Sequence, residues 1–367
     1  MDETHLDWLK LKLVSRLGSL IFGRLVRHFG SAGAVLGAGG KQLQQVRGVS
    51  REIADSIAGK KYLNHLQAHL EALERLTARM LIMDDQDYPC YLRHIPNPPP
   101  VLFMKGQLRH TPAVAVVGSR LPTGYGQKIA EELGRGLAAQ GISVVSGLAR
   151  GIDAAAHRGA LAAGNYSIGI LACSLDYVYP RENAALIAEM SRQGAVISEY
   201  LINNPPKPGL FPVRNRIIAG MSQAIVVVEA SLRSGSLITA RHGLEQGREI
   251  FAVPGPVHSP LSQGCHELLR QGANILTSVD DLLAFLPLSP QGDASHKTEF
   301  KIIPSRSGLD LPAQHANILN LINIEPLHID AVIRQSGLSS QEVMVILVEL
   351  EINGYVDQLP GQHYVRL

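Results

Sequence analysis

The stretch from Ala113 to His157 constrains the fold most strongly, because one pattern occurs in it twice. Each copy is a short apolar run, then a glycine-containing turn, then a helix-forming segment. The apolar runs, Ala113–Val117 and Ile142–Val145, have the length and the β-branched content of buried parallel strands. Two strand–turn–helix units in succession require right-handed crossovers. The stretch therefore predicts a Rossmann-like sheet.

The alternation of strand and helix continues to residue 277, which predicts an extended, mostly parallel α/β sheet with helices on both faces. Further strands are expected over 101–106, 166–173, 195–200, 224–230, 249–253 and 274–277, and helices from 123, from 153 and over 181–192, 211–221 and 235–246. The run Val101–Gly106 follows a proline-rich entry and is expected at the edge of the sheet.

The start of the chain predicts a smaller helical domain, residues 1–78, ahead of the sheet domain, residues 79–287. Short helical segments surround a Gly48-Val49-Ser50 turn and resemble a helix-hairpin-helix module of the sterile-alpha-motif-like class. Ser50 stands where such hairpins carry a second glycine, so packing or docking is favoured over contact with DNA. Residues 288–308 are rich in proline, serine and glycine and are interpreted as a linker.

The last domain, residues 309–367, has the pattern of a winged helix, with three helices before a hairpin that turns at Pro360-Gly361. Most winged helices bind DNA through the third helix. Here that helix, Ser339–Asn353, carries three glutamates and neither lysine nor arginine. The pattern favours a protein-contact or regulatory role.

Charge is distributed unevenly along a chain whose 367 residues carry a net charge of only +2. Residues 1–110 have 15 Lys and Arg against 10 Asp and Glu, residues 111–300 have 15 of each, and residues 301–367 have 4 against 7. An anion site in the neutral middle part must therefore come from the placement of particular residues.

Cysteine content and hydropathy favour a cytoplasmic protein without membrane contact. The 3 cysteines are far apart and form no CxxC motif, which is typical of a reducing compartment. No apolar run approaches the roughly 18–20 residues of a membrane span. The acidic N-terminus does not fit a signal peptide.

Three glycine-containing turns follow predicted strands, and parallel topology places all of them at the carboxyl edge of the sheet. The residues that we expect to bind nucleic acid there are Gly118, Ser119 and Arg120 in the first turn, Gly147 and Gly151 in the second, Ser234, Gly235 and Ser236 in the third, and Lys207, Phe211, Arg214, Asn215 and Arg216 from the stretch before the strand at 224–230. Backbone amides and guanidinium groups bind phosphates, and an aromatic ring stacks a base. These residues, called the glycine rim below, predict an anion site that suits a nucleotide chain.

Simpler interpretations of the same residues stay open. The glycines also fit turns that are merely tight, and the arginines also fit salt bridges to Glu199, Glu229 or Glu245. Asp153 and His157 lie four residues apart on a predicted helix and are expected to orient the second turn rather than to catalyse a reaction.

Several nucleotide-binding and catalytic motifs are absent from the sequence. The glycines after the first strand lack GxGxxG spacing, and Ser146 stands where a dinucleotide-binding acid belongs, which disfavours a dehydrogenase. The Walker, HExxH and GxSxG patterns do not occur. His65 and His69 have metal-ligand spacing but no third ligand nearby. The sequence predicts no metal ion, no cofactor and no catalytic residue.

Longer motifs follow one another in a characteristic order: AVAVVGSR, SGLARGIDAAAH, GAVISEY, FPVRNRIIAG, AIVVVEASLRSGSLITARHGLEQGR and FAVPG. In these motifs the chain resembles the DNA-processing protein A family (DprA, also called Smf). The resemblance covers about residues 90–280, and the two outer domains fit the family as well. It implies a protein that binds single-stranded DNA, protects incoming DNA and loads the RecA recombinase during natural transformation. It also implies a homodimer formed by the Rossmann domains and no known catalysis.

Individual positions match the family's motifs. The resemblance implies a phosphate pocket at the GSR turn, residues 118–120, and DNA contacts by Lys207 and Phe211. Residues 214–216 match the family's RNR segment, and residues 234–236 match its SGS turn. Two stretches depart from the family pattern. Ala172–Ser174 replaces a glycine-containing turn, and Gln263–Glu267 replaces a GTN motif.

Two other functions compete with this interpretation. A Rossmann nucleotide hydrolase of the lysine-decarboxylase-like type would show PGGxGTxxE, whereas Pro254-Gly255 is followed here by Pro256-Val257-His258. Release of a free base from a nucleoside monophosphate would favour this hydrolase. A transcription regulator that acts through the winged helix would prefer duplex DNA, and the acidic third helix disfavours it.

Overall fold

The computed structural model describes residues 2–286, 312–323, 326–352, 355–359 and 361–366. Contacts divide the described chain into two compact units, one up to residue 286 and the other from residue 312. The predicted linker, residues 288–308, lies outside the described residues. Within the described ranges, no helix combines the length and the apolar character needed to cross a membrane.

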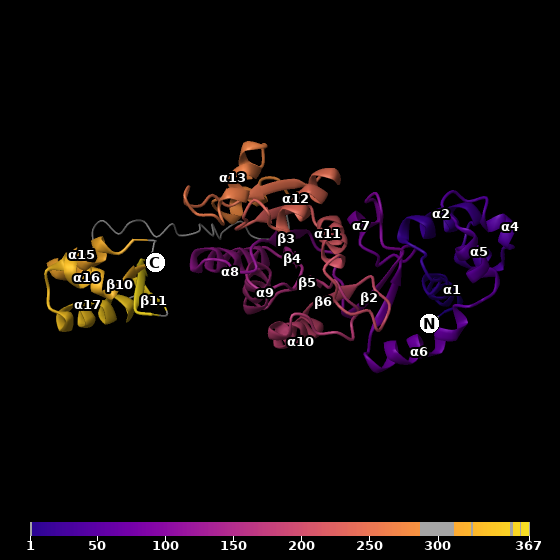
Figure 1. Cartoon of the computed structure of the whole chain (residues 1–367), viewed down its shortest axis with the longest axis horizontal. Helices are drawn as coiled ribbons and strands as arrows, with labels where there is room; N and C mark the ends of the chain where they lie inside the picture. Colours follow the sequence, from indigo (N-terminus) through magenta and orange to yellow (C-terminus); the bar gives the residue numbers. More distant parts are fainter. Residues whose placement is uncertain (1, 287–311, 324–325, 353–354, 360, 367) are drawn as a thin grey trace. The chain divides into compact units, whose positions relative to one another are not determined.

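A mixed sheet organises the first unit (Figure 1). Within the described residues it has nine strands in the order β1-β2-β6-β5-β4-β3-β7-β8-β9. The strands are β1 (Arg79–Ile82), β2 (Val101–Gly106), β3 (Ala113–Val117), β4 (Ser143–Ser146), β5 (Ser167–Ile170), β6 (Ala195–Ser198), β7 (Ala224–Val227), β8 (Glu249–Ala252) and β9 (Asn274–Ile275). Strands from β6 to β9 pair in parallel, and β1 and β2 join antiparallel. The predicted α/β class is confirmed.

The expectation that Val101–Gly106 forms an edge strand is wrong. In the structure β2 lies between β1 and β6, and β1 is the strand that sequence reasoning missed. Val101, Leu102, Phe103 and Met104 are all buried in succession. Such a run fits a strand covered on both faces, which is the position of an inner strand.

Helices cover both faces of this sheet. Those between residues 90 and 286 are α7 (Cys90–Arg93), α8 (Gly124–Ala139), α9 (Ile152–Ala162), the 3₁₀ turn η1 (Arg181–Asn183), α10 (Ala184–Gln193), α11 (Leu210–Gly220), α12 (Ser236–Glu245), α13 (Gln263–Arg270) and α14 (Val279–Leu283). In β3, Val114 and Val116 pack in the core of α8 and α9, whereas Ala115 and Val117 pack in the core of α11 and α12. Figure 1 shows these two pairs of helices on opposite sides of the strands.

The N-terminal helices belong to the same compact unit as the sheet. They are α1 (Glu3–Lys12), α2 (Ser19–Phe29), α3 (Ala32–Gly37), α4 (Gly40–Leu43), α5 (Arg51–Ala58) and α6 (Leu63–Arg75). Trp8 and Phe22 form an aromatic contact in their core, with ring centroids 5.2 Å apart. Val101 and Phe103 of β2 share that core. The domain boundary at 78–79 stays a prediction, because the helices pack directly on the sheet.

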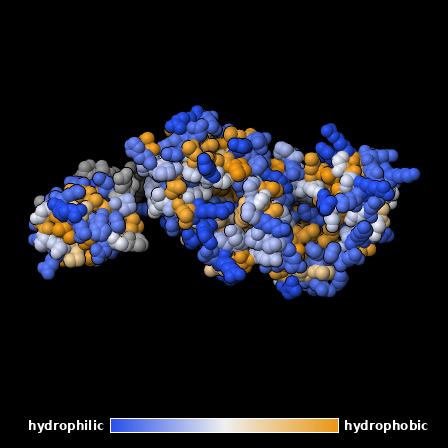
Figure 2. Space-filling view, in the orientation of Figure 1, coloured by the Kyte–Doolittle hydropathy of each residue, from blue (hydrophilic) through white to orange (hydrophobic). Residues whose placement is uncertain are grey.

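The second unit is a winged helix with its own apolar core, as predicted. Its elements are α15 (Ala313–Leu321), β10 (Leu327–His328), α16 (Ile329–Ser336), α17 (Ser340–Ile352), β11 (Val356–Leu359) and β12 (His363–Arg366). The strands form a small sheet in the order β10-β12-β11. Met344, Val345 and Val348 of α17 are exposed. Figure 2 shows hydrophobic side chains among hydrophilic ones on the visible surface of this unit.

Candidate nucleic-acid interface

The first turn of the glycine rim follows β3. Its shape is held from within, since the Ser119 hydroxyl accepts from the Leu121 amide at 3.1 Å and the Ser119 carbonyl accepts from the Ile152 amide at 3.1 Å. Gly118 packs against Ile152, because an added Cβ would lie 2.6 Å from that side chain. The Arg120 side chain is exposed at the end of this turn.

The second turn follows β4, and a buried carboxylate holds it. Asp153 accepts from the amides of Gly147 at 3.0 Å and Ala149 at 3.3 Å. The Asn183 side chain donates to the carbonyls of Leu148 at 2.9 Å and Ala149 at 3.1 Å. The prediction that Asp153 orients this turn is confirmed. His157 instead contacts the Ser167 hydroxyl at 2.7 Å.

Arg214 lies directly beneath the second turn. A Cβ on Gly147 would come within 2.0 Å of the Arg214 Nη1 atom, so only glycine leaves room for the guanidinium group. That group is buried and donates to the Ile170 carbonyl at 2.5 Å. Desolvation lowers the pKa of Arg214 to about 10, and the charge of nearby Asp153 opposes the shift. The side chain is still protonated at neutral pH, so a positive charge sits under the rim.

The other two residues of the RNR segment are also buried. Arg216 forms an ion pair with Glu199 at 2.6 Å, and both side chains are less than a tenth exposed. This is the salt bridge that the sequence offered as an alternative to phosphate binding. Asn215 donates to the Gly235 carbonyl at 3.2 Å and so ties α11 to the third turn.

The third turn precedes α12 and is closed by its own serines. The hydroxyls of Ser234 and Ser236 lie 2.7 Å apart, and the Ser236 amide donates to the Ser234 hydroxyl at 3.3 Å. Ser236 is buried, whereas Gly235 is exposed. Gly151, at the end of the second turn, has a φ of 73°.

A cavity of about 200 Å³ brings part of the rim together. It is lined by Arg120, Leu121, Gly147, Leu148, Ala149, Arg150, Leu171, Ala172, Cys173, Tyr179, Pro180 and Phe211. The Arg120 guanidinium carbon lies 5.2 Å from the centroid of the Phe211 ring, which is a cation–π contact. Lys207 is exposed in the turn that leads into α11, four residues before Phe211. Three of the predicted residues thus share one cavity, and the SGS turn does not line it.

Sequence reasoning missed Tyr179, Arg150 and Cys173 as lining residues of this cavity. The Tyr179 ring lies 5.5 Å from the Phe211 ring, and Arg150 pairs with Glu182 at 2.6 Å. Burial raises the pKa of the Cys173 thiol to about 11, so it is protonated at neutral pH. One signal was available: the run Tyr177–Tyr179 places three large side chains in a loop, where no periodic pattern assigns them to a core.

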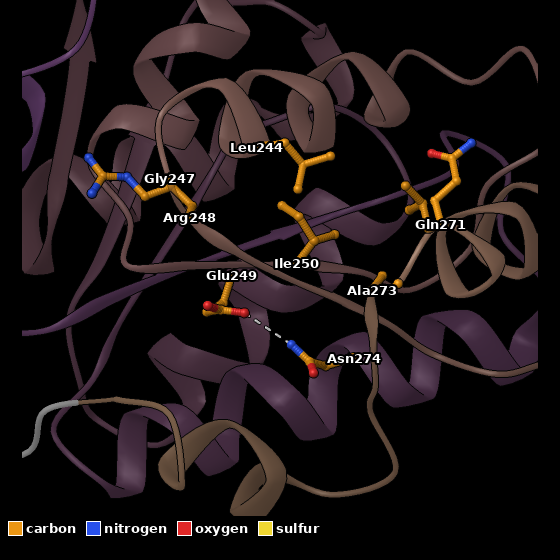
Figure 3. A pocket seen from close by; sticks show the side chains of 10 residues that line it. Leu244, Gly247, Arg248, Glu249, Ile250, Gln271, Ala273 and Asn274 are labelled. Atoms are coloured by element: carbon orange, nitrogen blue, oxygen red, sulfur yellow. Dashed lines mark hydrogen bonds between the residues drawn. The ribbon is translucent and has the colours of Figure 1, made fainter.

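A second cavity, of about 270 Å³, opens at the opposite edge of the sheet (Figure 3). Glu249 and Asn274, the first residues of β8 and β9, line it and are joined by a hydrogen bond of 3.2 Å. Figure 3 shows Ile250 next to this pair, and Leu244 also lines the cavity. None of the residues predicted to bind nucleic acid lines this cavity.

Metal-ligating side chains do not gather in the described part of the chain, where no group of three or more His, Cys, Asp or Glu residues has a metal-binding arrangement. The His69 ring contacts the His65 carbonyl at 2.9 Å. The Asp153 carboxylate at the rim accepts hydrogen bonds from backbone amides of the second turn.

Comparison with known proteins gives one consistent result. Residues 79–287 match the family described as DNA recombination-mediator protein A, and residues 304–362 match the DprA winged helix domain. Protein Smf from Synechocystis sp. is 34% identical over 98% of both chains. The X-ray structure of DNA processing protein A from Streptococcus pneumoniae is similar with a TM-score of 0.70 and 34% identity, over 79% of this chain and 100% of that one. The structure describing the single-stranded DNA binding mode of DNA processing protein A from Helicobacter pylori has a TM-score of 0.52 and 31% identity, over 56% and 94%.

Proposed function

The chain belongs to the DNA recombination-mediator protein A family, also called DprA or Smf, and on that premise we propose that it binds single-stranded DNA at the glycine rim. It acts in the cytoplasm by binding rather than by catalysis. The observation that carries the proposal is the shared cavity of Arg120, Gly147 and Phe211. An exposed cation, a tight backbone turn and an aromatic face lie there within reach of one nucleotide.

The cavity offers separate contacts for the two parts of a nucleotide. Arg120 presents a planar guanidinium group that fits phosphate oxygens, and Lys207 adds a second exposed cation beside α11. Phe211 is half-buried and offers its ring to a base. Such contacts favour single strands, because the bases of a duplex are already stacked and paired.

Buried charge supports these exposed groups. Arg214 contributes a positive potential from beneath Gly147, in surroundings that solvent screens weakly. The amides of Gly147 and Ala149 are bound by Asp153, so the second turn holds its shape without a ligand. Arg214 and Asp153 therefore prepare the rim, whereas Arg120, Lys207 and Phe211 contact the DNA.

Titration of labelled oligonucleotides with the wild type and with Arg120→Ala tests the proposal. We expect fluorescence anisotropy to show a strong preference for single strands over duplexes. Arg120→Ala weakens binding by about tenfold, because a charged hydrogen bond is lost, and lowers the slope of log affinity against log salt by about 1. Arg135→Ala, an exposed arginine on α8, is the control and leaves both values unchanged.

Other outcomes would reverse the proposal. An unchanged salt slope in Arg120→Ala would place DNA elsewhere on the protein. Equal binding of duplexes and single strands would favour the winged-helix regulator. Release of a free base from a nucleoside monophosphate, with no DNA binding, would favour the hydrolase.

We further propose that two copies assemble through their Rossmann domains and deliver bound DNA to the RecA recombinase in natural transformation. Two rims in one dimer hold a strand with greater avidity than either rim alone. Exposed Leu244 and Ile275, near the terminal strand β9, offer an apolar surface for assembly.

Sedimentation and a loading assay test assembly and delivery. Ile275→Glu is expected to shift the sedimenting species from dimer to monomer, whereas Leu63→Glu on α6 leaves it unchanged.

The wild type is expected to shorten the lag of RecA assembly on strands precoated with a single-strand-binding protein. A monomeric wild type would contradict the proposed dimer, and an unaltered lag would contradict the proposed delivery of DNA to RecA.

A further inference from the structure

We propose that Tyr179 is a second base-stacking residue, so that Tyr179 and Phe211 form one aromatic platform for two neighbouring bases of a single strand. The inference rests on the proposed function and deepens it, since it names a contact that the family motifs do not assign. It starts from geometry: the two ring centroids lie 5.5 Å apart at an interplanar angle of 54°, and both rings line the same cavity.

The exposure of Tyr179 leaves room for a ligand at the cavity. The residue is 39% exposed, so part of its ring is open to a stacking base. Tyr88 and Tyr166 of the same domain are instead fastened by their hydroxyls, which donate to the carbonyls of Pro99 and Gln107. Among the aromatic contacts of the described residues, that of Tyr179 is with Phe211, the ring expected to stack a base.

The loop that carries Tyr179 is firmly anchored on both sides. The Cys173 carbonyl accepts from the Ser198 hydroxyl at 2.6 Å, and Ser174 exchanges hydrogen bonds with the backbone of Asn204. After the tyrosine, Asn183 binds the second turn of the rim, and Glu182 pairs with Arg150. A ring held in this way loses little conformational entropy when a base stacks on it.

The charges around the platform favour a strand that passes over both rings. Arg120 lies over Phe211, whereas Arg150, which also lines the cavity, pairs with Glu182. A phosphate beside a base stacked on the rings therefore has the Arg120 guanidinium group within reach. Stacking on tyrosine and phenylalanine is tolerant of base identity, so the platform takes single-stranded DNA of mixed sequence.

An experiment that separates base from backbone tests the inference. Binding of a dT oligonucleotide and of an abasic oligonucleotide of equal length is measured for the wild type, Tyr179→Ala, Tyr179→Phe and the loop control Tyr177→Ala. Tyr179→Ala is expected to weaken dT binding by about tenfold and abasic binding by less than about twofold, because only the base stacks. Tyr179→Phe and Tyr177→Ala are expected to bind both strands like the wild type.

The outcomes distinguish this inference from the proposed function. Equal losses on both oligonucleotides, or no loss in Tyr179→Ala, would overturn the role of Tyr179 while leaving DNA binding in place. Failure of the wild type to bind dT, or an unaffected Arg120→Ala, would overturn the proposed function itself.

A second measurement needs no variant and therefore does not depend on the folding of Tyr179→Ala. Strands that carry 5-iodouracil crosslink to stacked aromatic side chains on irradiation. With the wild type, we expect fragment spectra to locate crosslinks at both Tyr179 and Phe211. Crosslinks at Phe211 without any at Tyr179 would overturn the inference.

Discussion

A buried guanidinium group under a glycine leaves no room for a side chain at one position of the rim. Arg214 fills the space where a side chain at position 147 would begin. The same group faces Asp153, whose pKa is raised by desolvation against the opposing charge of Arg214. The pair is therefore a structural support for the second turn, and its effect on DNA passes through the shape of that turn.

Gly147→Ala should disturb this support. The new methyl group must displace either the turn or Arg214, so we expect a loss of about 1–3 kcal/mol in unfolding free energy and weaker binding of single strands. Urea unfolding and anisotropy measure the two effects. Gly124→Ala is the control, because an added Cβ there meets nothing within 4 Å. Wild-type behaviour of Gly147→Ala would show that the turn does not need this packing.

His157 should make the stability of the protein depend on pH. Burial lowers its pKa from 6.5 to about 3, and the charges of Arg214 and Arg158 act in the same direction. Below pH 6.5 the unfolded chain then binds a proton that the folded chain does not, so stability falls with decreasing pH by up to about 1.4 kcal/mol per unit, until about pH 3.

Urea unfolding at pH 7 and pH 5 measures this dependence. The wild type is expected to lose about 2 kcal/mol more than His157→Gln between these values. Asp153 has the opposite effect on stability, since its raised carboxyl pKa favours the folded state as the pH falls. The comparison between the two proteins isolates His157, and identical pH profiles would contradict its role.

Among the elements, α8 and α9 cross at unusually short range beneath the sheet. Gly134 of α8 allows this approach, because an added Cβ would lie 2.1 Å from the Ala156 carbonyl of α9. Both helices begin at turns of the rim, so their separation sets the position of those turns. Backbone atoms cannot yield there as a flexible side chain would.

Gly134→Ala is therefore expected to lower the melting temperature, with a loss of about 2–4 kcal/mol. Gly23→Ala, also inside a helix, is the control. No atom lies within 4 Å of its added Cβ, so alanine raises stability by about 0.5–1 kcal/mol. Calorimetry measures the melting temperatures of both variants. A stabilising effect of Gly134→Ala would contradict the close packing of α8 on α9.

The sequence predicted the elements better than the side-chain environments. Buried strands such as Ala224–Val227 are short apolar runs between turns, so their pattern identifies them directly. The inner position of β2 was missed because β1, whose sequence RMLI contains one β-branched residue, gave too weak a signal for a pairing partner. Strand order depends on long-range pairing that no local pattern records.

At the glycine rim too, the sequence predicted where the turns lie better than which side chains are buried. Parallel topology was enough to place the GSR turn and the second turn at one edge, because strand direction determines where turns meet. The burial of Arg214 and Arg216 was not predictable, since α11 is covered on all sides from residue 214 to 220 and has no polar stripe. The contact of Tyr179 with Phe211 joins residues 32 positions apart and depends on the path of a loop.

At the scale of the whole molecule, two units with separate cores share the chain. The winged helix unit presents an α17 helix with exposed apolar and acidic side chains, which phosphates repel. We therefore extend the proposed function by assigning DNA binding to the first unit and contact with a protein to the second.

A chain that ends at residue 286 should therefore bind single strands within about twofold of the full chain and with the same salt slope. Anisotropy at two salt concentrations measures both. Circular dichroism confirms that the shortened chain is folded. A tenfold loss, or a flatter salt slope, would instead assign DNA contacts to the winged helix.

The anchored turns of the rim also bear on how long a strand stays bound. Asp153 and Asn183 hold the second turn before any ligand arrives, so encounter requires no rearrangement, and arrival is governed by diffusion and charge. Substitutions that strengthen or weaken DNA binding are then expected to change the dissociation rate, and with it the residence time of the strand. On the proposed function, each nucleotide leaves this rigid surface independently, whereas the two rims of the proposed dimer retain the strand. We then expect stepwise release of the DNA, in which a competing protein filament can occupy each nucleotide as it leaves the rim.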